Sequence, residues 1–154
     1  SGAKQILPQV TSVKLAFDQH PKAFEVAGLE IDAVRIPHAG WPSRAEIENL
    51  VFRVTLNSQN TSVTVMHLGD ADPEDKHFLP YKSHWKERVS DTALPPYWFY
   101  FSAEGNDILN EIINAKQSIG IHVPVVIPNQ LKSGTVDYFS APGETRNIGE
   151  SHKH

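Results

Sequence analysis

The segment from Val63 to Asp72 constrains the fold more than any other part of the sequence. It reads VTVMHLGDAD. A Val-rich run that alternates with Thr predicts a β-strand, and Gly69 allows the backbone to turn sharply where the run ends. The imidazole of His67 and the carboxylate of Asp70 therefore stand at the carboxyl end of a buried strand. Sheet enzymes commonly hold their chemistry at such ends, so we expect functional residues here.

Two more histidines occupy similar positions. His38 ends the apolar stretch that begins at Ile31, and His122 follows the apolar residues 119–121. Imidazole and carboxylate groups are the side chains that bind Zn²⁺ when cysteine is absent. The sequence therefore predicts that His38, Asp70 and His122, although far apart along the chain, are brought together as a metal site.

The rest of the pattern is rich in strands with short turns. Residues 24–31 predict a hairpin around Ala27-Gly28, and residues 50–66 predict a second one around the polar cluster 57–60. A long solvated loop with one helical turn is expected over 70–90, an amphipathic helix over 106–116, and a short strand over 119–122. The predicted fold class is α/β (α+β) with a mixed, mostly antiparallel sheet. We expect one domain over residues 1–148, followed by a flexible tail over 149–154.

Composition restricts the classes of function. The chain has 154 residues, 40% hydrophobic and 21% charged, as in soluble globular proteins. A net charge of −4 without a basic cluster argues against nucleic acid as a partner. No apolar run approaches the roughly 18 residues of a membrane span. The absence of cysteine excludes a Cys-ligated metal. The compartment stays open between bacterial cytoplasm and periplasm.

In their order and spacing, these pieces resemble the C-terminal half of a metallo-β-lactamase-fold hydrolase. The likeness is greatest to the branch with the ascorbate-6-phosphate lactonase-like and N-acyl-phosphatidylethanolamine phospholipase-like enzymes. It rests on two hairpins leading to His38 and Asp70, a following strand, a strand before His122 and a terminal strand after a Pro-Gly turn. The matching segments are 24–38, 49–56, 62–70, 91–96, 119–123 and 140–148.

The resemblance implies half of a four-layer αββα sandwich and a zinc-dependent hydrolase. In such an enzyme, metal-activated water attacks an ester, lactone, amide or phosphodiester of a small-molecule substrate. His38, Asp70 and His122 would be metal ligands, with Asp70 bridging two divalent cations. Zinc is the expected metal, and manganese and iron are the alternatives.

Other residues near the predicted ligands receive supporting roles. His67 is expected to hold a ligand carboxylate in place rather than to bind metal. Trp41 and Arg44, in the loop after His38, are candidate substrate contacts, an apolar surface and an anion partner; a packed loop is the alternative for both. His77 and His84 are expected in the solvated loop, with a substrate-facing wall as the alternative.

The chain departs from the family at one decisive point. The His-x-His-x-Asp-His signature of the family's N-terminal half does not occur in it. We therefore expect a fragment, a processed product or one half of a split domain, which leaves open whether this chain alone is an enzyme. The alternative is a non-catalytic binding or assembly module. A half sandwich would leave a sheet face uncovered, so we expect either the missing N-terminal half or a homodimer partner on it.

Overall fold

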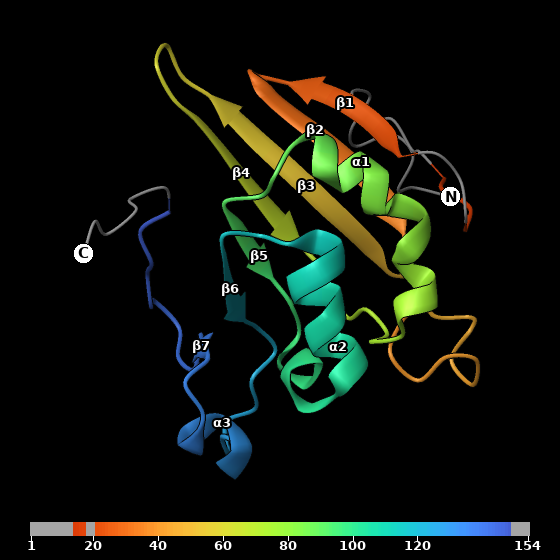
Figure 1. Cartoon of the computed structure of the whole chain (residues 1–154), viewed down its shortest axis with the longest axis vertical. Coiled ribbons are helices and arrows are strands. Elements are labelled where there is room, and N and C mark those ends of the chain that lie inside the picture. Colours follow the sequence, from red (N-terminus) through yellow and green to blue (C-terminus); the bar gives the residue numbers. More distant parts are fainter. Residues whose placement is uncertain (1–13, 18–20, 149–154) are drawn as a thin grey trace, which may run out of the picture.

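The computed structural model describes residues 14–17 and 21–148 as an α/β fold built on one seven-stranded mixed sheet (Figure 1). The strands lie side by side in the order in which they occur along the chain. The predicted tail over 149–154 lies outside the described residues. The strands are β1 (Lys22–Val26), β2 (Leu29–Arg35), β3 (Leu50–Asn57), β4 (Ser62–His67), β5 (Thr92–Leu94), β6 (Gln117–Gly120) and β7 (Asp137–Tyr138).

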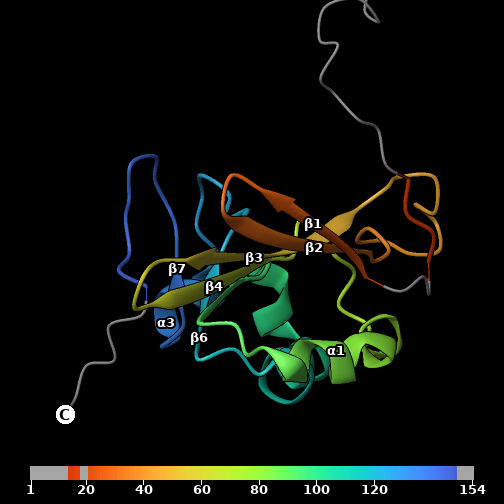
Figure 2. The ribbon, with the colours of Figure 1, turned by 90° about the horizontal axis from the view of Figure 1, so that it is seen from above.

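Short helices fill the connections after β4. α1 and α2 pack on the same side of the sheet (Figure 2). In the part of the chain that the structure describes, no helix is long and apolar enough to cross a membrane. The helices are the 3₁₀ turns η2 (Asp75–His77), η3 (Leu79–Tyr81) and η4 (Tyr97–Phe101), the α-helices α1 (Lys82–Glu87), α2 (Ala103–Asp107) and α3 (Asn129–Ser133), and the π-helix η5 (Ile108–Ile113).

The predicted mixed sheet is confirmed, and its two halves are built differently. β1 to β4 pair antiparallel through the two expected hairpins. The first turn has positive φ at both Ala27 (50°) and Gly28 (83°), as a two-residue hairpin requires. β4 to β7 pair in parallel over shorter ladders. Parallel neighbours need crossover connections, which the helices between β4 and β6 supply.

The predicted helix over 106–116 is displaced. It begins at Ala103, because the Ser102 hydroxyl oxygen accepts a hydrogen bond from the backbone N–H of Gly105 (2.9 Å) and caps the helix. It ends at Ile113, where Asn114 takes a left-handed conformation (φ 50°). Four apolar residues of the π-helix are buried, as the periodicity indicates: Ile108, Leu109, Ile112 and Ile113.

The predicted terminal strand over 140–148 is wrong. β7 covers only Asp137–Tyr138, and residues 140–148 form a loop. The Glu144 carboxylate accepts hydrogen bonds from the backbone N–H groups of Ser140 (2.9 Å) and Ala141 (2.6 Å). The side chain therefore uses donors that a strand would need for its ladder.

The segment over 70–90 is not the solvated loop that the sequence indicated. It contains η2, η3 and α1, and the side chains of His77 and His84 are only 11% and 28% exposed. Buried aromatic residues fix it to the core. The rings of Phe78 and Trp85 lie 5.9 Å apart, and Phe78 also meets Phe99 edge to face at 5.8 Å.

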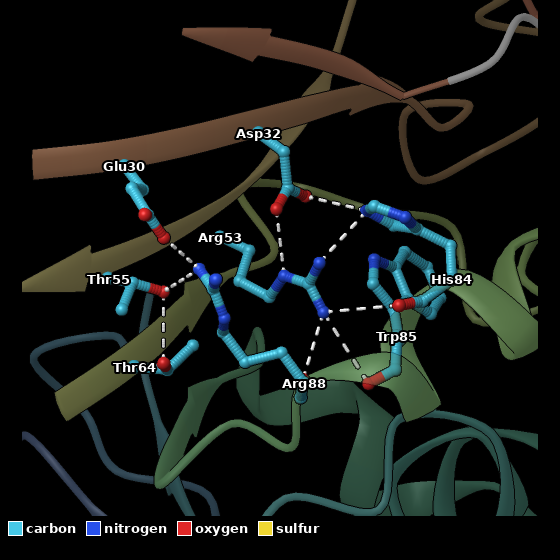
Figure 3. A network of polar contacts seen from close by, with 8 residues as sticks. All are labelled: Glu30, Asp32, Arg53, Thr55, Thr64, His84, Trp85 and Arg88. Carbon is cyan, nitrogen blue, oxygen red and sulfur yellow. Dashed lines mark hydrogen bonds and ion pairs between the residues drawn. The ribbon is translucent and has the colours of Figure 1, made fainter. Parts of the chain in front are cut away.

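A buried arginine joins the sheet to α1 (Figure 3). Arg53 on β3 is 4% exposed and lies opposite Asp32 of β2, to whose carboxylate its Nε donates a hydrogen bond of 2.8 Å. Its Nη1 donates to the backbone carbonyl groups at the end of α1: His84 (3.3 Å), Trp85 (3.4 Å) and Arg88 (2.9 Å). A charged side chain thus takes an apolar position, since it caps the orphan carbonyls of a helix end.

Asp91 ties β4 to the chain before β6. Its carboxylate accepts hydrogen bonds from the Thr64 backbone N–H (2.8 Å) and from Lys116 Nζ (2.6 Å). Burial acts to raise the pKa of Asp91, but these hydrogen bonds outweigh burial and hold the pKa below its ordinary value of 3.8.

Because the pKa of Asp91 is lowered in the folded state, the free energy of unfolding depends on pH in the acid range. The unfolded chain binds the proton more tightly, so the stabilisation is complete above the ordinary pKa and is lost as the pH falls through the lower folded-state pKa. In urea titrations at successive pH values, Asp91→Asn should lose less stability on acidification than the unchanged chain. Equal acid sensitivity of the two proteins would contradict this role.

The sheet face opposite the helices carries apolar side chains that no layer of the described residues covers. We call the set Phe52, Val54, Leu56, Val63 and Val65 the open face. Phe52 and Leu56 are 37% and 54% exposed, whereas alternate residues of β3 point to the helices and are buried. Figure 2 shows α1 and α2 on one side of the sheet, and no helix of residues 14–17 and 21–148 lies on the other side. The described residues therefore leave this sheet face without a second layer.

Candidate metal centre

A short bridge between two loops brings His38 beside Asp70. The backbone N–H of Ala39 donates to the carbonyl of Asp70 (2.8 Å), and that of Asp72 donates to the carbonyl of Pro37 (2.8 Å). The two segments thus pair antiparallel, with His38 opposite Ala71. These segments follow β2 and β4, so the ends of two sheet strands set the position of both side chains.

The structure brings the three predicted ligands together around one carboxylate. His38 Nε2 lies 3.5 Å from Asp70 Oδ2, and His122 Nε2 lies 3.2 Å from Asp70 Oδ1. Each imidazole therefore faces a different oxygen of the same carboxylate. Two ligand atoms on one tetrahedral Zn²⁺, at bonds of about 2.1 Å, lie about 3.4 Å apart. The spacing fits a carboxylate that bridges two cations.

The hydrogen bonding of His38 leaves the correct nitrogen for a metal. Its Nδ1 lies 2.8 Å from the carbonyl of Ala39, which can only accept, so Nδ1 carries the proton. In the neutral ring, Nε2 then carries a lone pair, and this lone pair is directed at the Asp70 carboxylate. Two facing acceptors repel unless a cation or a proton lies between them. Metal-binding histidines are oriented by this kind of second hydrogen bond.

His122 reaches Asp70 from an uncommon backbone conformation. Its φ is 60°, in the left-handed region that residues with a Cβ seldom adopt. The Trp98 ring stacks on the imidazole (6.1 Å, 27°), and its Nε1 donates to the Ala71 carbonyl (3.0 Å). Trp98 thus fixes both His122 and the loop that carries Asp70. β6 ends at Gly120, so His122 lies beyond the strand in which the sequence placed it.

His67 lies at the end of β4, near the other ligands but directed differently. Its Nδ1 accepts a hydrogen bond from the backbone N–H of Gly69 (3.0 Å), which supports the turn before Asp70. Loss of hydration and the nearby His122 lower the pKa of His67, while the charge of Asp70 acts to raise it. His67 thus supports the turn before Asp70, and its predicted contact with a ligand carboxylate stays a prediction.

The structure directs Trp41 and Arg44 to packing contacts, and those of Trp41 reach two distant segments of the chain. The Trp41 ring meets Phe17 (5.5 Å) and His77 (5.9 Å) edge to face. The Arg44 side chain lies over Gly40, where an added Cβ would stand 3.0 Å from its Cδ. These contacts correspond to the packed loop that was the alternative. Substrate contact by either residue stays a prediction.

Asn49 is a site residue that the sequence reading missed. Its Oδ1 accepts from the backbone N–H of Asp70 (2.9 Å), and its Nδ2 donates to the carbonyl of Leu68 (3.2 Å). An added Cβ at Gly69 would stand 2.3 Å from this Oδ1, so glycine is needed for the contact. The last pair of β3 and β4 is Phe52 with His67, and the same register continued by three residues places Asn49 opposite Asp70. The predicted hairpin could therefore have identified Asn49 as a neighbour of Asp70.

We expect Asn49→Ala to destabilise the chain by about 1–3 kcal/mol, because a buried N–H and a carbonyl lose their partners. Zn²⁺ affinity should fall with it, since the Asp70 backbone is no longer held. Urea unfolding and zinc titration measure the two effects. Asn57→Ala is the matched control, because Asn57 only accepts an exposed hydrogen bond from Ser62. Equal effects of the two substitutions would remove Asn49 from the site.

The donor set fits divalent cations with nitrogen and oxygen preference. Two imidazole nitrogens and one bridging carboxylate are ligands that Zn²⁺, Mn²⁺ and Fe²⁺ accept. A catalytic zinc ion has about three protein ligands. Two such cations therefore need more ligands than the three that His38, Asp70 and His122 supply. No family model matches the chain, and no curated protein matches it in sequence.

Proposed function

We propose that this chain is the C-terminal half of a dinuclear metal-dependent hydrolase. The observation that carries the proposal is the arrangement of His38 and His122 on the two oxygens of Asp70, with the Nδ1 of His38 engaged by the Ala39 carbonyl and Nε2 directed at the carboxylate. The chemistry supplied by bound metal would be a hydroxide formed from water at neutral pH, able to attack an ester, lactone, amide or phosphodiester.

The chain's own residues would position this chemistry. Asp70 places its carboxylate between the two imidazoles, and His38 and His122 each direct Nε2 at one of its oxygens. Asn49 fixes the Asp70 backbone, and Trp98 fixes the His122 ring. Because these supports come from separate connections, the ligand geometry is set by the folded sheet rather than by a local motif.

The missing ligands and the open face point to the same partner. The absent His-x-His-x-Asp-His segment would supply the remaining ligands, and a second sheet from the N-terminal half would cover the open face. The open face also supports the alternative, a non-catalytic assembly module that uses this surface without chemistry. Metal content separates the two proposals.

The experiment compares the isolated chain with the chain expressed together with the segment encoded directly upstream. Metal content is measured after dialysis, and turnover is tested on generic ester, lactone and phosphodiester substrates. We expect weak metal retention and no appreciable turnover from the chain alone, and two cations with turnover from the pair. Neither metal nor turnover in the pair would favour the assembly module. Stoichiometric zinc and robust turnover by the isolated chain would show that half of the site is not missing.

We expect the isolated chain to self-associate through the open face. Burying apolar surface is worth about 25 cal/mol per Å², and a two-fold dimer is the commonest closed arrangement. Sedimentation equilibrium at micromolar concentration should give a mass above 17.2 kDa, and Val54→Lys should return it to the monomer value. A cooperatively unfolding monomer of the unchanged chain would show that the open face needs no partner.

A further inference from the structure

A second group of ligand-type side chains lies just after the predicted metal centre. One atom from each of Asp72, Glu74 and His77 lies within 4.8 Å of the others. Asp72 is in the loop that follows β4, and His77 ends η2. None of the three belongs to the set around Asp70.

One oxygen of the Asp72 carboxylate faces His77 without a hydrogen bond from the described residues. The side chain is 7% exposed, and Oδ1 accepts from the backbone N–H groups of Gly40 (3.1 Å) and Trp41 (3.4 Å). Oδ2 is buried, and no hydrogen bond to it is found among residues 14–17 and 21–148. It lies 3.7 Å from His77 Nε2, too far for a hydrogen bond. A buried carboxylate oxygen without a donor is costly unless a cation or a proton meets it.

The other two side chains complete a donor set with an opening to solvent. The His77 side chain is 11% exposed, and the Glu74 side chain is 37% exposed. A cation can therefore enter past Glu74, whose present partner is the exposed Lys76. One imidazole and two carboxylates suit a borderline divalent cation, with Zn²⁺ favoured over Mn²⁺ by the general affinity order.

We propose that Asp72, Glu74 and His77 bind a structural divalent cation, Zn²⁺ in the first instance. This cation would connect Asp72, in the loop that follows β4, to His77 at the end of η2. Asp72 also holds Gly40 and Trp41, which follow His38. Binding would thus lock the two segments that present His38 and Asp70. The proposal is independent of chemistry at Asp70, since it uses different side chains.

The test uses the full chain with competing sites removed. The background carries Asp70→Asn and His38→Ala, together with His152→Ala and His154→Ala, because terminal histidines can bind zinc on their own. Zn²⁺ is titrated against a fluorescent chelator, and the thermal midpoint is measured with and without Zn²⁺. We expect one Zn²⁺ per chain and a higher midpoint when it is bound.

The decisive variants in this background are Glu74→Gln and His77→Gln. Each should weaken Zn²⁺ binding at least ten-fold and reduce the rise in the midpoint. Asp75→Asn, which removes the same charge from the same segment outside the cluster, should leave both unchanged. Asp72 is not substituted, because it also holds the Gly40 and Trp41 amides. A background protein that binds no Zn²⁺, or binding unchanged in both variants, would overturn the proposal.

Discussion

Replacing Arg53 by alanine is expected to cost the fold about 3–5 kcal/mol, the range for removing one partner of a buried charge pair. Asp32 would keep a carboxylate that is 14% exposed without its strongest donor. Three backbone carbonyls at the end of α1 would also lose Arg53 Nη1. A domain's net stability is about 5–15 kcal/mol, so the variant should be close to unfolded. The measurement is urea unfolding followed by circular dichroism.

Arg88→Ala is the matched control, because it removes the same type of side chain from a solvated position. The Arg88 side chain is 44% exposed and pairs with Glu30, whose side chain is 43% exposed. It also donates one hydrogen bond to the Thr55 hydroxyl (3.0 Å). Exposed ion pairs are worth about 0–1 kcal/mol, so this variant should remain folded. If Arg53→Ala lost no more stability than Arg88→Ala, the Arg53 contacts drawn in Figure 3 would not hold α1 to the sheet.

The second large effect is expected from Asp70→Asn, on metal binding rather than on stability. The side chain keeps its shape but loses the charge that both imidazoles face. Mutation of groups that only support ligands costs about 10–100-fold in metal affinity, so loss of a bridging ligand should cost about 100-fold or more. Zinc titration of both proteins by competition with a chelator measures the change, with Glu74→Gln and His77→Gln present in both so that the second proposed site is weakened.

The control for this variant is Asp107→Asn, which removes an equal charge from the exposed end of α2. It should leave zinc affinity unchanged. Circular dichroism should show that Asp70→Asn remains folded, because the Asp70 carboxylate is 42% exposed. If Asp70→Asn and the unchanged chain bound zinc with equal affinity, Asp70 would be excluded as a ligand.

Local signals in the sequence were sufficient for the first half of the fold. Both hairpins depend on turn residues within a few positions, such as Ala27-Gly28, and on alternation that continues along each strand. The approach of His38, Asp70 and His122 was predictable for a related reason. Each follows an apolar stretch, and strands of one sheet can bring their ends to one edge.

Features that depend on distant contacts were not predictable in this way. The terminal strand was wrongly predicted because the Glu144 carboxylate accepts hydrogen bonds from the backbone N–H groups of Ser140 and Ala141. The hydrophobic periodicity of the sequence does not indicate such side-chain hydrogen bonds. Arg53 occupies an apolar position only because the end of α1 lies against it. The burial of His77 likewise follows from packing against Trp41, a residue far from it in sequence.

The measurement that tests the central claim most directly is anomalous X-ray diffraction at the zinc edge from crystals soaked in millimolar Zn²⁺. We expect one peak between His38 Nε2 and Asp70 Oδ2 and one between His122 Nε2 and Asp70 Oδ1, about 2.0–2.2 Å from these atoms. A peak at Asp72, Glu74 and His77 would report the second site separately. Zinc bound elsewhere on the chain, with the three side chains in place and no peak beside Asp70, would contradict the account.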